Sequence, residues 1–223
     1  MKTHQKTRHL TRTVGLAIAA AALAVVPAGQ ALAATSNDTS QLSVTAGSLA
    51  FETAPDVPSM GTLTLDGQSQ TKTAQLPNWS ANDATGTGSG WNVTTQGDSG
   101  VGKSAVFMEY CTDEIECGTV GYVTAGETLA ANSLTLSSSG AAFTALNGST
   151  GSAPTQSCAS TCNVDTGTAV NIASAPVDAG MGTWQADTYG ASSLSLSAPT
   201  TVKALGAGEV YRADILWTLS SGP

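Results

Sequence analysis

Short runs in which apolar and polar residues alternate recur along this chain and restrict what it can fold into. Each is bounded by glycine, proline or serine, and four of them are QLSVTAG (41–47), GTLTLDG (61–67), SLTLSS (133–138) and SLSLSA (193–198). A period of two residues places the apolar side chains on one face of a strand. Short strands separated by turn residues predict an antiparallel all-β fold, a single-domain β-sandwich with immunoglobulin-like layers.

The N-terminal segment has the pattern of a secretory signal peptide. Residues 1–13 are basic and lack acids, an apolar stretch runs from Val14 to Val26, and the small residues ALA follow at 31–33. This arrangement predicts cleavage after Ala33, and the apolar stretch is too short to span a bilayer. We therefore expect a secreted, extracellular protein without a membrane span, with a flexible segment over 34–40 and the sandwich domain over 41–223.

Removal of the signal peptide changes the chemistry available to the chain. It takes four of the eight Lys and Arg residues, both histidines and none of the sixteen acids, so the formal charge falls from −8 to −12. A chain without histidine lacks the base of Ser-His-Asp and Cys-His sites and the imidazole ligand of metals. The remaining cations are too few to neutralise a phosphate backbone: Lys72, Lys103, Lys203 and Arg212. We expect no nucleic-acid partner and no cofactor.

The four cysteines form two close pairs, Cys111 with Cys117 and Cys158 with Cys162. In an exported chain they predict two disulfides. Four cysteines allow three pairings and the sequence does not choose among them, although the two local loops are favoured here. Neither spacing is C-x-x-C, so we expect no zinc site.

The stretch GDSGVGKS (97–104) matches the phosphate-binding loop pattern, in which Lys103 and Ser104 would contact phosphate and magnesium. That loop requires a buried parallel strand before it and a helix after it. Here a cysteine-bracketed acidic loop follows instead. We interpret the match as a turn rich in glycine and serine, and we expect no nucleotide partner.

Four acids lie together in the sequence at Glu109, Asp113, Glu114 and Glu116. Clustered carboxylates suit calcium, but the spacing matches no EF-hand loop, which favours a solvated acidic loop. A glycan hydrolase would need two carboxylates facing each other across a cleft. No motif supports such a pair, so we expect no enzyme, and a carboxylate-dependent glycan hydrolase is the distant alternative.

Two segments resemble the signatures of the WxL domain, a secreted cell-surface module of Gram-positive bacteria. The distal signature is YRADILWTLSSGP, and the proximal signature is DATGTGSGWNV, where valine stands in place of the usual leucine. The resemblance extends over about 61–223. The residues that carry it are Trp91, Val93, Tyr211, Trp217, Leu219 and Pro223.

The resemblance implies a non-catalytic cell-wall module that binds peptidoglycan non-covalently. The family is also associated with wall-bound surface proteins, so the alternative is a structural subunit that docks on a larger partner. A charge of −12 would repel anionic wall polymers. Attraction is therefore expected from glycan stacking, hydrogen bonds, bridging cations or a protein partner.

The aromatic residues divide into core and surface candidates. Alternate residues of a strand share a face, so Tyr211, Trp217 and Leu219 form one apolar side, and we expect this side and Trp91 to face the core. Trp79, Trp184 and Tyr189 lie outside that alternation. Because aromatic faces stack on sugar rings, we name these three as candidate glycan-binding residues.

Overall fold

The computed structural model describes residues 39–222. The predicted signal peptide, most of the 34–40 segment and Pro223 lie outside the described residues. The chain divides into a unit that ends at Ser43 and a larger unit from Val44 to Pro223. All the described strands belong to the larger unit.

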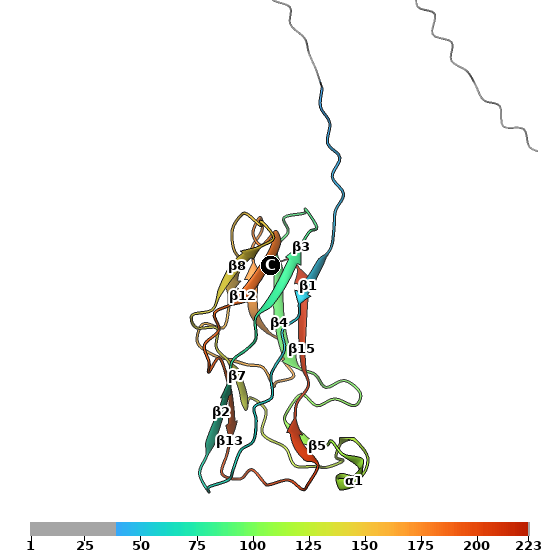
Figure 1. The fold of residues 1–223 in the computed structure, drawn as a ribbon, viewed down its shortest axis with the longest axis vertical. Coiled ribbons are helices and arrows are strands. Elements are labelled where there is room, and N and C mark those ends of the chain that lie inside the picture. Colours follow the sequence, from blue (N-terminus) through green and yellow to red (C-terminus); the bar gives the residue numbers. More distant parts are fainter. Residues whose placement is uncertain (1–38, 223) are drawn as a thin grey trace, which may run out of the picture. The chain divides into compact units, whose positions relative to one another are not determined.

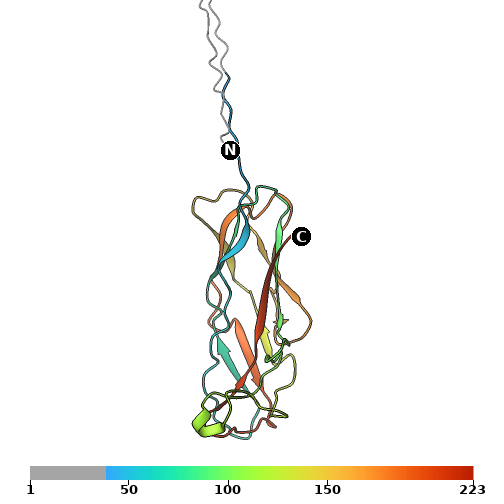
Figure 2. The ribbon, with the colours of Figure 1, turned by 90° about the vertical axis from the view of Figure 1, so that its right-hand side faces the viewer.

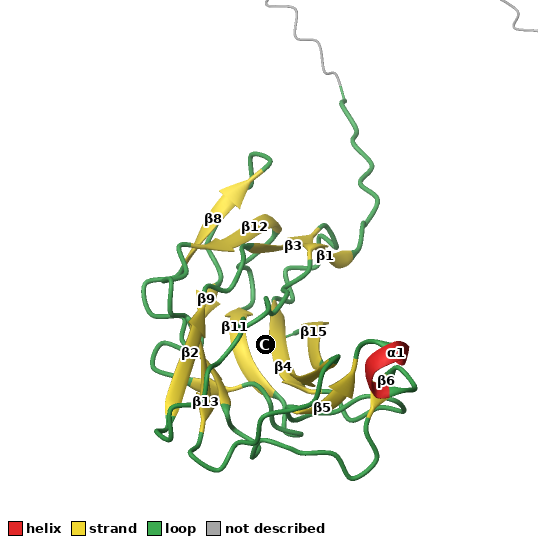
Figure 3. Ribbon diagram, turned by 60° about the horizontal axis from the view of Figure 1, so that its bottom comes forward, coloured by secondary structure: helices red, strands yellow, loops and turns green. Residues whose placement is uncertain are grey.

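The larger unit contains four antiparallel sheets, here named A to D. Sheet A has the strand order β1 (Leu49–Thr53), β3 (Trp79–Asp83), β12 (Gly182–Asp187) and β8 (Ala142–Leu146). Sheet C has the order β15 (Ile215–Ser221), β4 (Trp91–Gly97), β11 (Val170–Ala175) and β9 (Thr155–Gln156). These two sheets form separate layers (Figure 3).

Sheets B and D complete the unit. Sheet B has the order β10 (Cys162–Asn163), β7 (Leu134–Leu136), β13 (Leu194–Ala198) and β2 (Gln70–Ala74). Sheet D has the order β14 (Glu209–Arg212), β5 (Met108–Cys111) and β6 (Gly121–Tyr122). The one helix of residues 39–222 is the single turn α1 (Glu114–Cys117). The prediction of an antiparallel all-β sandwich is confirmed.

Aromatic rings join the two layers of the sandwich. The Phe143 ring on β8 lies 5.5 Å from Trp79 of its own sheet and 6.1 Å from Trp91 of sheet C, measured between centroids, and both contacts are edge-to-face. Trp79 and Trp91 are both fully buried. Edge-to-face packing stabilises such pairs by more than the burial of their apolar area alone. The contact between Phe143 and Trp91 therefore fixes how sheet A packs on sheet C.

Two of the four alternating runs form the strands that their pattern predicts, and two do not. The runs at 133–138 and 193–198 contain β7 and β13. The prediction is wrong for 41–47 and 61–67, which contain no strand, and Leu42 and Val44 are 88% and 83% exposed. Alternating apolar residues can share one face of an extended segment, but a strand also needs hydrogen bonds from a neighbouring strand. No strand is paired with either segment in the described part of the chain.

Candidate functional site

The two signature segments are neighbouring strands of sheet C. β15 pairs with β4 along its whole length (Figure 1, Figure 2). In this register Leu219 lies opposite Val93, and Trp217 lies opposite Thr95. Segments more than a hundred residues apart in the sequence therefore form one structural feature.

The β4 half of this pair faces the core. Its residues alternate between buried and half-buried, with Trp91 and Val93 at 0% exposure. The Trp91 indole Nε1 donates a hydrogen bond of 3.1 Å to the carbonyl oxygen of Gly180. Trp91 and Val93 both belong to the hydrophobic core of the sandwich.

The β15 half is only partly covered. On this strand Trp217 and Leu219 are half-buried and pack against the core cluster, while Leu216 faces outward and is 40% exposed. Tyr211 lies on β14 of sheet D, is half-buried, and donates from its hydroxyl to the carbonyl oxygen of Lys203 over 3.1 Å. The apolar side predicted to run through Tyr211, Trp217 and Leu219 is therefore divided between β14 and β15, and both parts lie at the margin of the core.

The three candidate glycan-binding residues are buried. Trp79 is 0% exposed, Trp184 5% and Tyr189 3%. Their polar atoms bond inside the protein: Trp79 Nε1 donates to the Tyr189 hydroxyl at 3.0 Å, and Trp184 Nε1 donates to the Met181 carbonyl at 3.0 Å. This burial contradicts the prediction that the three residues bind a glycan, because none of their rings offers a face to a ligand.

Trp217 is the tryptophan of residues 39–222 that is half-buried and not fully buried. It lines a hollow of about 190 Å³ together with Asp56 from the segment after β1, Arg212 at the end of β14 and Asp214 from the turn that follows. The hollow thus combines an aromatic ring, a guanidinium group and two carboxylates. Sequence reasoning missed Asp56, Arg212 and Asp214, although the latter two lie within the distal signature.

Hydrogen bonds fix Asp214 at the edge of the hollow. Its carboxylate accepts from the Tyr122 hydroxyl at 2.5 Å, from the Ser104 backbone N–H at 3.1 Å and from Arg212 Nη2 at 3.0 Å. Burial alone would raise the pKa of Asp214, but these three donors outweigh it and hold the pKa below its ordinary value. Asp214 is therefore a stable carboxylate at neutral pH.

An aromatic pair positions Arg212. Its guanidinium carbon lies 4.5 Å from the centroid of the Tyr110 ring, and Tyr110 packs edge-to-face on Tyr122 at 5.0 Å. The hydrogen bond to Asp214 raises the pKa of Arg212 above its usual value. Two of the three charged groups of the hollow, those of Arg212 and Asp214, are thus oriented in advance, which lowers the entropic cost of binding a ligand.

A family model described as the WxL domain, surface cell wall-binding, matches residues 25–223. The chain belongs to the WxL family. This membership places it at the cell surface and identifies it as a cell wall-binding protein. No curated protein and no solved structure matches the chain. Among residues 39–222, no helix of this WxL protein is long and apolar enough to cross a membrane.

The stretch that matches a phosphate-binding loop is a turn in this WxL protein. Lys103 Nζ forms an ion pair of 2.5 Å with Asp98, and its backbone N–H donates to the Gly100 carbonyl at 3.0 Å. Ser104 donates from its hydroxyl to the carbonyl oxygen of Val106. The residues that follow lead into β5, not into a helix. Lys103 and Ser104 therefore bond within the turn.

Replacing Lys103 by alanine tests this interpretation. The Lys103 side chain is half exposed, so its ion pair with Asp98 is screened by solvent and contributes little. We expect Lys103→Ala to melt within about 2 °C of the wild type, since exposed substitutions have small effects. Isothermal titration with ATP or GTP and magnesium should give no binding to either protein. Saturable nucleotide binding that Lys103→Ala abolishes would contradict the assignment.

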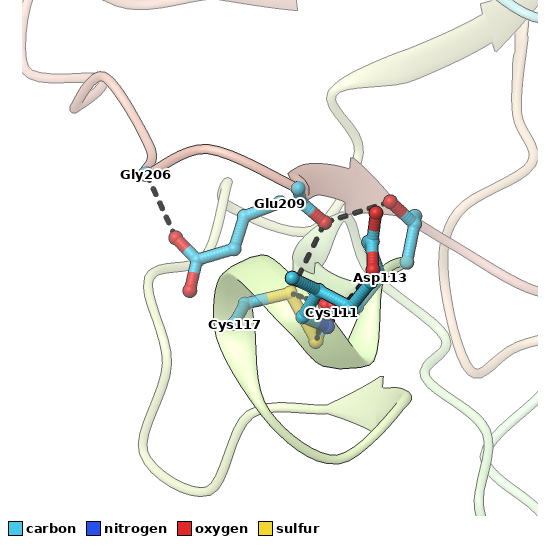
Figure 4. The surroundings of a disulfide bond; sticks show 8 residues. Cys111, Asp113, Cys117, Gly206 and Glu209 are labelled. Atoms are coloured by element: carbon cyan, nitrogen blue, oxygen red, sulfur yellow. Dashed lines mark hydrogen bonds between the residues drawn. A yellow bond between two sulfur atoms is a disulfide. The ribbon is translucent and has the colours of Figure 1, made fainter.

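The cysteines pair locally, as favoured from the sequence. Cys111 bonds to Cys117, and Cys158 bonds to Cys162. The first disulfide closes the loop that contains α1 and lies against the start of β14, where Glu209 accepts from the Gly206 backbone N–H (Figure 4). Two local crosslinks thus pin loops of the sandwich.

Two members of the acidic cluster have structural roles. Asp113 caps α1 by accepting from the Ile115 N–H at 2.9 Å, and Glu109 accepts from the Glu127 N–H at 2.8 Å. Glu114 and Glu116 are exposed to solvent. Within residues 39–222, no three His, Cys, Asp or Glu side chains lie where they could bind a metal ion together. The solvated loop remains the interpretation of this cluster.

Proposed function

We propose that this WxL protein binds peptidoglycan non-covalently and directly, through the hollow at Trp217. The observation that carries the proposal is that Trp217, which is half-buried, lines one hollow with Asp56, Arg212 and Asp214. The other three tryptophans are buried, so stacking on a sugar by tryptophan within residues 39–222 depends on this ring. Wall binding by the family supports the same assignment.

The chemistry of the hollow suits a glycan that carries peptide stems. The apolar C–H face of a sugar stacks on the indole, while the carboxylates of Asp56 and Asp214 accept hydrogen bonds from sugar hydroxyls. The guanidinium of Arg212 pairs with a carboxylate of a stem peptide. Stacking and hydrogen bonding do not depend on net charge, so they can operate on a protein with an excess of acids.

The protein is non-catalytic under this proposal. A glycan hydrolase needs one carboxylic acid whose pKa is raised so that it can donate a proton. In the hollow, the pKa of Asp214 lies below its ordinary value. Burial does raise the pKa of Asp165, but that side chain is fully buried and accepts from the Ser133 backbone N–H at 2.9 Å. Asp165 cannot reach a glycan.

Co-sedimentation with insoluble peptidoglycan tests the proposal. We expect the purified protein to sediment with the wall material, and Asp56→Asn to weaken the affinity about fivefold to tenfold, since a hydrogen bond to a charged acceptor is replaced by a neutral one. The matched control is Glu52→Gln on β1, which removes another exposed carboxylate that lies outside the hollow. Equal loss in both variants would show that charge alone matters and would overturn the assignment of the hollow.

The same assay separates the alternatives. Release of soluble sugars, abolished when one carboxylate is replaced, would identify a glycan hydrolase. If the protein does not sediment alone but does so with a co-secreted surface protein, it is a structural subunit that docks on a partner. Intact wall material in the pellet with the bound protein supports the proposal.

A further inference from the structure

A large apolar cavity lies in the sandwich unit and has no part in the proposed function. Its volume is about 760 Å³, and it opens between the strand-free segment 57–65, strands β13 and β14, and the connection 199–208. Ligand sites in proteins commonly have volumes of about 300–1,000 Å³ and predominantly apolar walls. The cavity therefore has the size and the character of a binding site.

The walls of the cavity are mainly aliphatic. Val57, Met60 and Leu63 contribute one side, and Leu196 contributes another. The buried side chains of Leu134 and Phe107 also line it. At its mouth, Leu65 and Val210 are 45% and 44% exposed. These exposed apolar side chains gather around one opening, and such gathering marks interaction sites on soluble proteins.

The cavity also collects positive charge. Lys72, Lys203 and Arg212 line it, so three of the four basic side chains of residues 39–222 lie at this one place. Glu209 is the acid among its lining residues, and one of its carboxylate oxygens accepts from the Gly206 N–H at 2.8 Å. The mature chain carries far more acids than bases. The composition of the chain therefore does not explain why three bases lie together at one apolar cavity.

Lys72 is the base that is available to a ligand. Lys203 pairs with Glu127 at 2.6 Å and Arg212 with Asp214 at 3.0 Å, whereas Lys72 forms no ion pair with the described residues. It lies on the edge strand β2, directly opposite Leu196 of β13. Its half-buried position shares a strand face with Gln70 and Ala74. A partly buried cation without a counter-ion favours an anionic group beside it.

We propose that this cavity binds a single-chain anionic amphiphile, with the aliphatic chain against the apolar walls and the anionic head group at Lys72. The aliphatic lining selects the chain, and the unpaired ammonium group selects the head. The site adjoins the proposed glycan-binding hollow, and four residues line both: Val57, Arg212, Ala213 and Ile215. Variants for the test therefore avoid Arg212.

Displacement of a fluorescent fatty acid tests the charge requirement. The purified protein is titrated with cis-parinaric acid below its micellar concentration and then with dodecanoate or dodecanol. We expect one saturable site, and Lys72→Met should weaken dodecanoate binding about tenfold while leaving dodecanol binding unchanged, because methionine keeps the apolar stem. Lys103→Met, which removes a base outside the cavity, should change neither. Equal effects on the acid and the alcohol would overturn the proposal.

A second pair of variants tests the location. Leu65→Glu places a charge at the mouth of the cavity, and Val101→Glu makes the same change at a fully exposed residue outside it. Only Leu65→Glu should abolish binding of the probe. Absence of saturable binding by the wild type would overturn the proposal, as would concentration-dependent dimerisation that Leu65→Glu abolishes while probe binding persists. Sedimentation of Lys72→Met with peptidoglycan should match the wild type, which separates this test from that of the proposed function.

Discussion

Replacing Trp91 by alanine is expected to destabilise the sandwich by about 3–5 kcal/mol. The indole is fully buried, it packs edge-to-face on Phe143 of the opposite sheet, and its Nε1 donates to the Gly180 carbonyl. Alanine would leave a cavity between the two sheets and an unpaired buried carbonyl oxygen. Since whole domains are stable by only about 5–15 kcal/mol, the variant should be largely unfolded or melt far below the wild type. Urea unfolding followed by fluorescence measures the difference.

The matched variant is Trp217→Ala on the neighbouring strand. Trp217 is half-buried, so we expect a smaller loss of stability than for Trp91→Ala. A folded Trp217→Ala protein that no longer sediments with peptidoglycan would support the hollow as the binding site. Equal destabilisation by the two substitutions would contradict the distinction drawn here between a core tryptophan and an accessible one.

Replacing Gly180 by alanine is expected to cost about 2–5 kcal/mol. The residue has a φ of +70°, in the left-handed region, where a side chain is disfavoured by about 1–2 kcal/mol. An added Cβ would lie 2.5 Å from the Cβ of Ala175 and 2.6 Å from Nε1 of Trp91. Overpacking of this kind costs about 1–3 kcal/mol more and would displace the indole. A lower melting temperature together with altered tryptophan fluorescence is the expected result.

Gly167→Ala provides the control for this substitution. A Cβ at Gly167 would meet no atom within 4 Å, and its φ is not in the left-handed region. Its melting temperature should stay close to that of the wild type. If Gly180→Ala is as stable as Gly167→Ala, the close packing of Gly180 against Trp91 is not a requirement of the fold.

Much of the fold could be predicted from local patterns. Period-two alternation identified β7 and β13, and the close spacing of the cysteines favoured the two disulfides that form. The same alternation failed at 61–67, where Leu63 and Leu65 line a cavity and no partner strand is present. A half-buried surface produces the same spacing of apolar residues whether it belongs to a strand or to a loop.

The candidate site was harder to predict from the sequence than the fold. Arg212 and Asp214 lie inside the distal signature, but Asp56 comes from the segment after β1 and joins them only in the folded chain. Trp79, Trp184 and Tyr189 are aromatic residues of the type that stacks on sugars, but all three are buried. An aromatic residue beside a polar loop has the same local sequence whether or not another sheet covers it.

The sequence by itself determined the class of fold and the family, because these depend on residue types at short or fixed spacing, and it favoured the pairing of nearby cysteines without determining it. The tertiary structure decided which tryptophan remains accessible and which base lacks a counter-ion. Trp91 and Trp217 lie on adjacent strands of one sheet, yet the first is covered by sheet A and the second lies at the margin of the core. Burial depends on what packs over a strand, and that layer comes from distant parts of the chain.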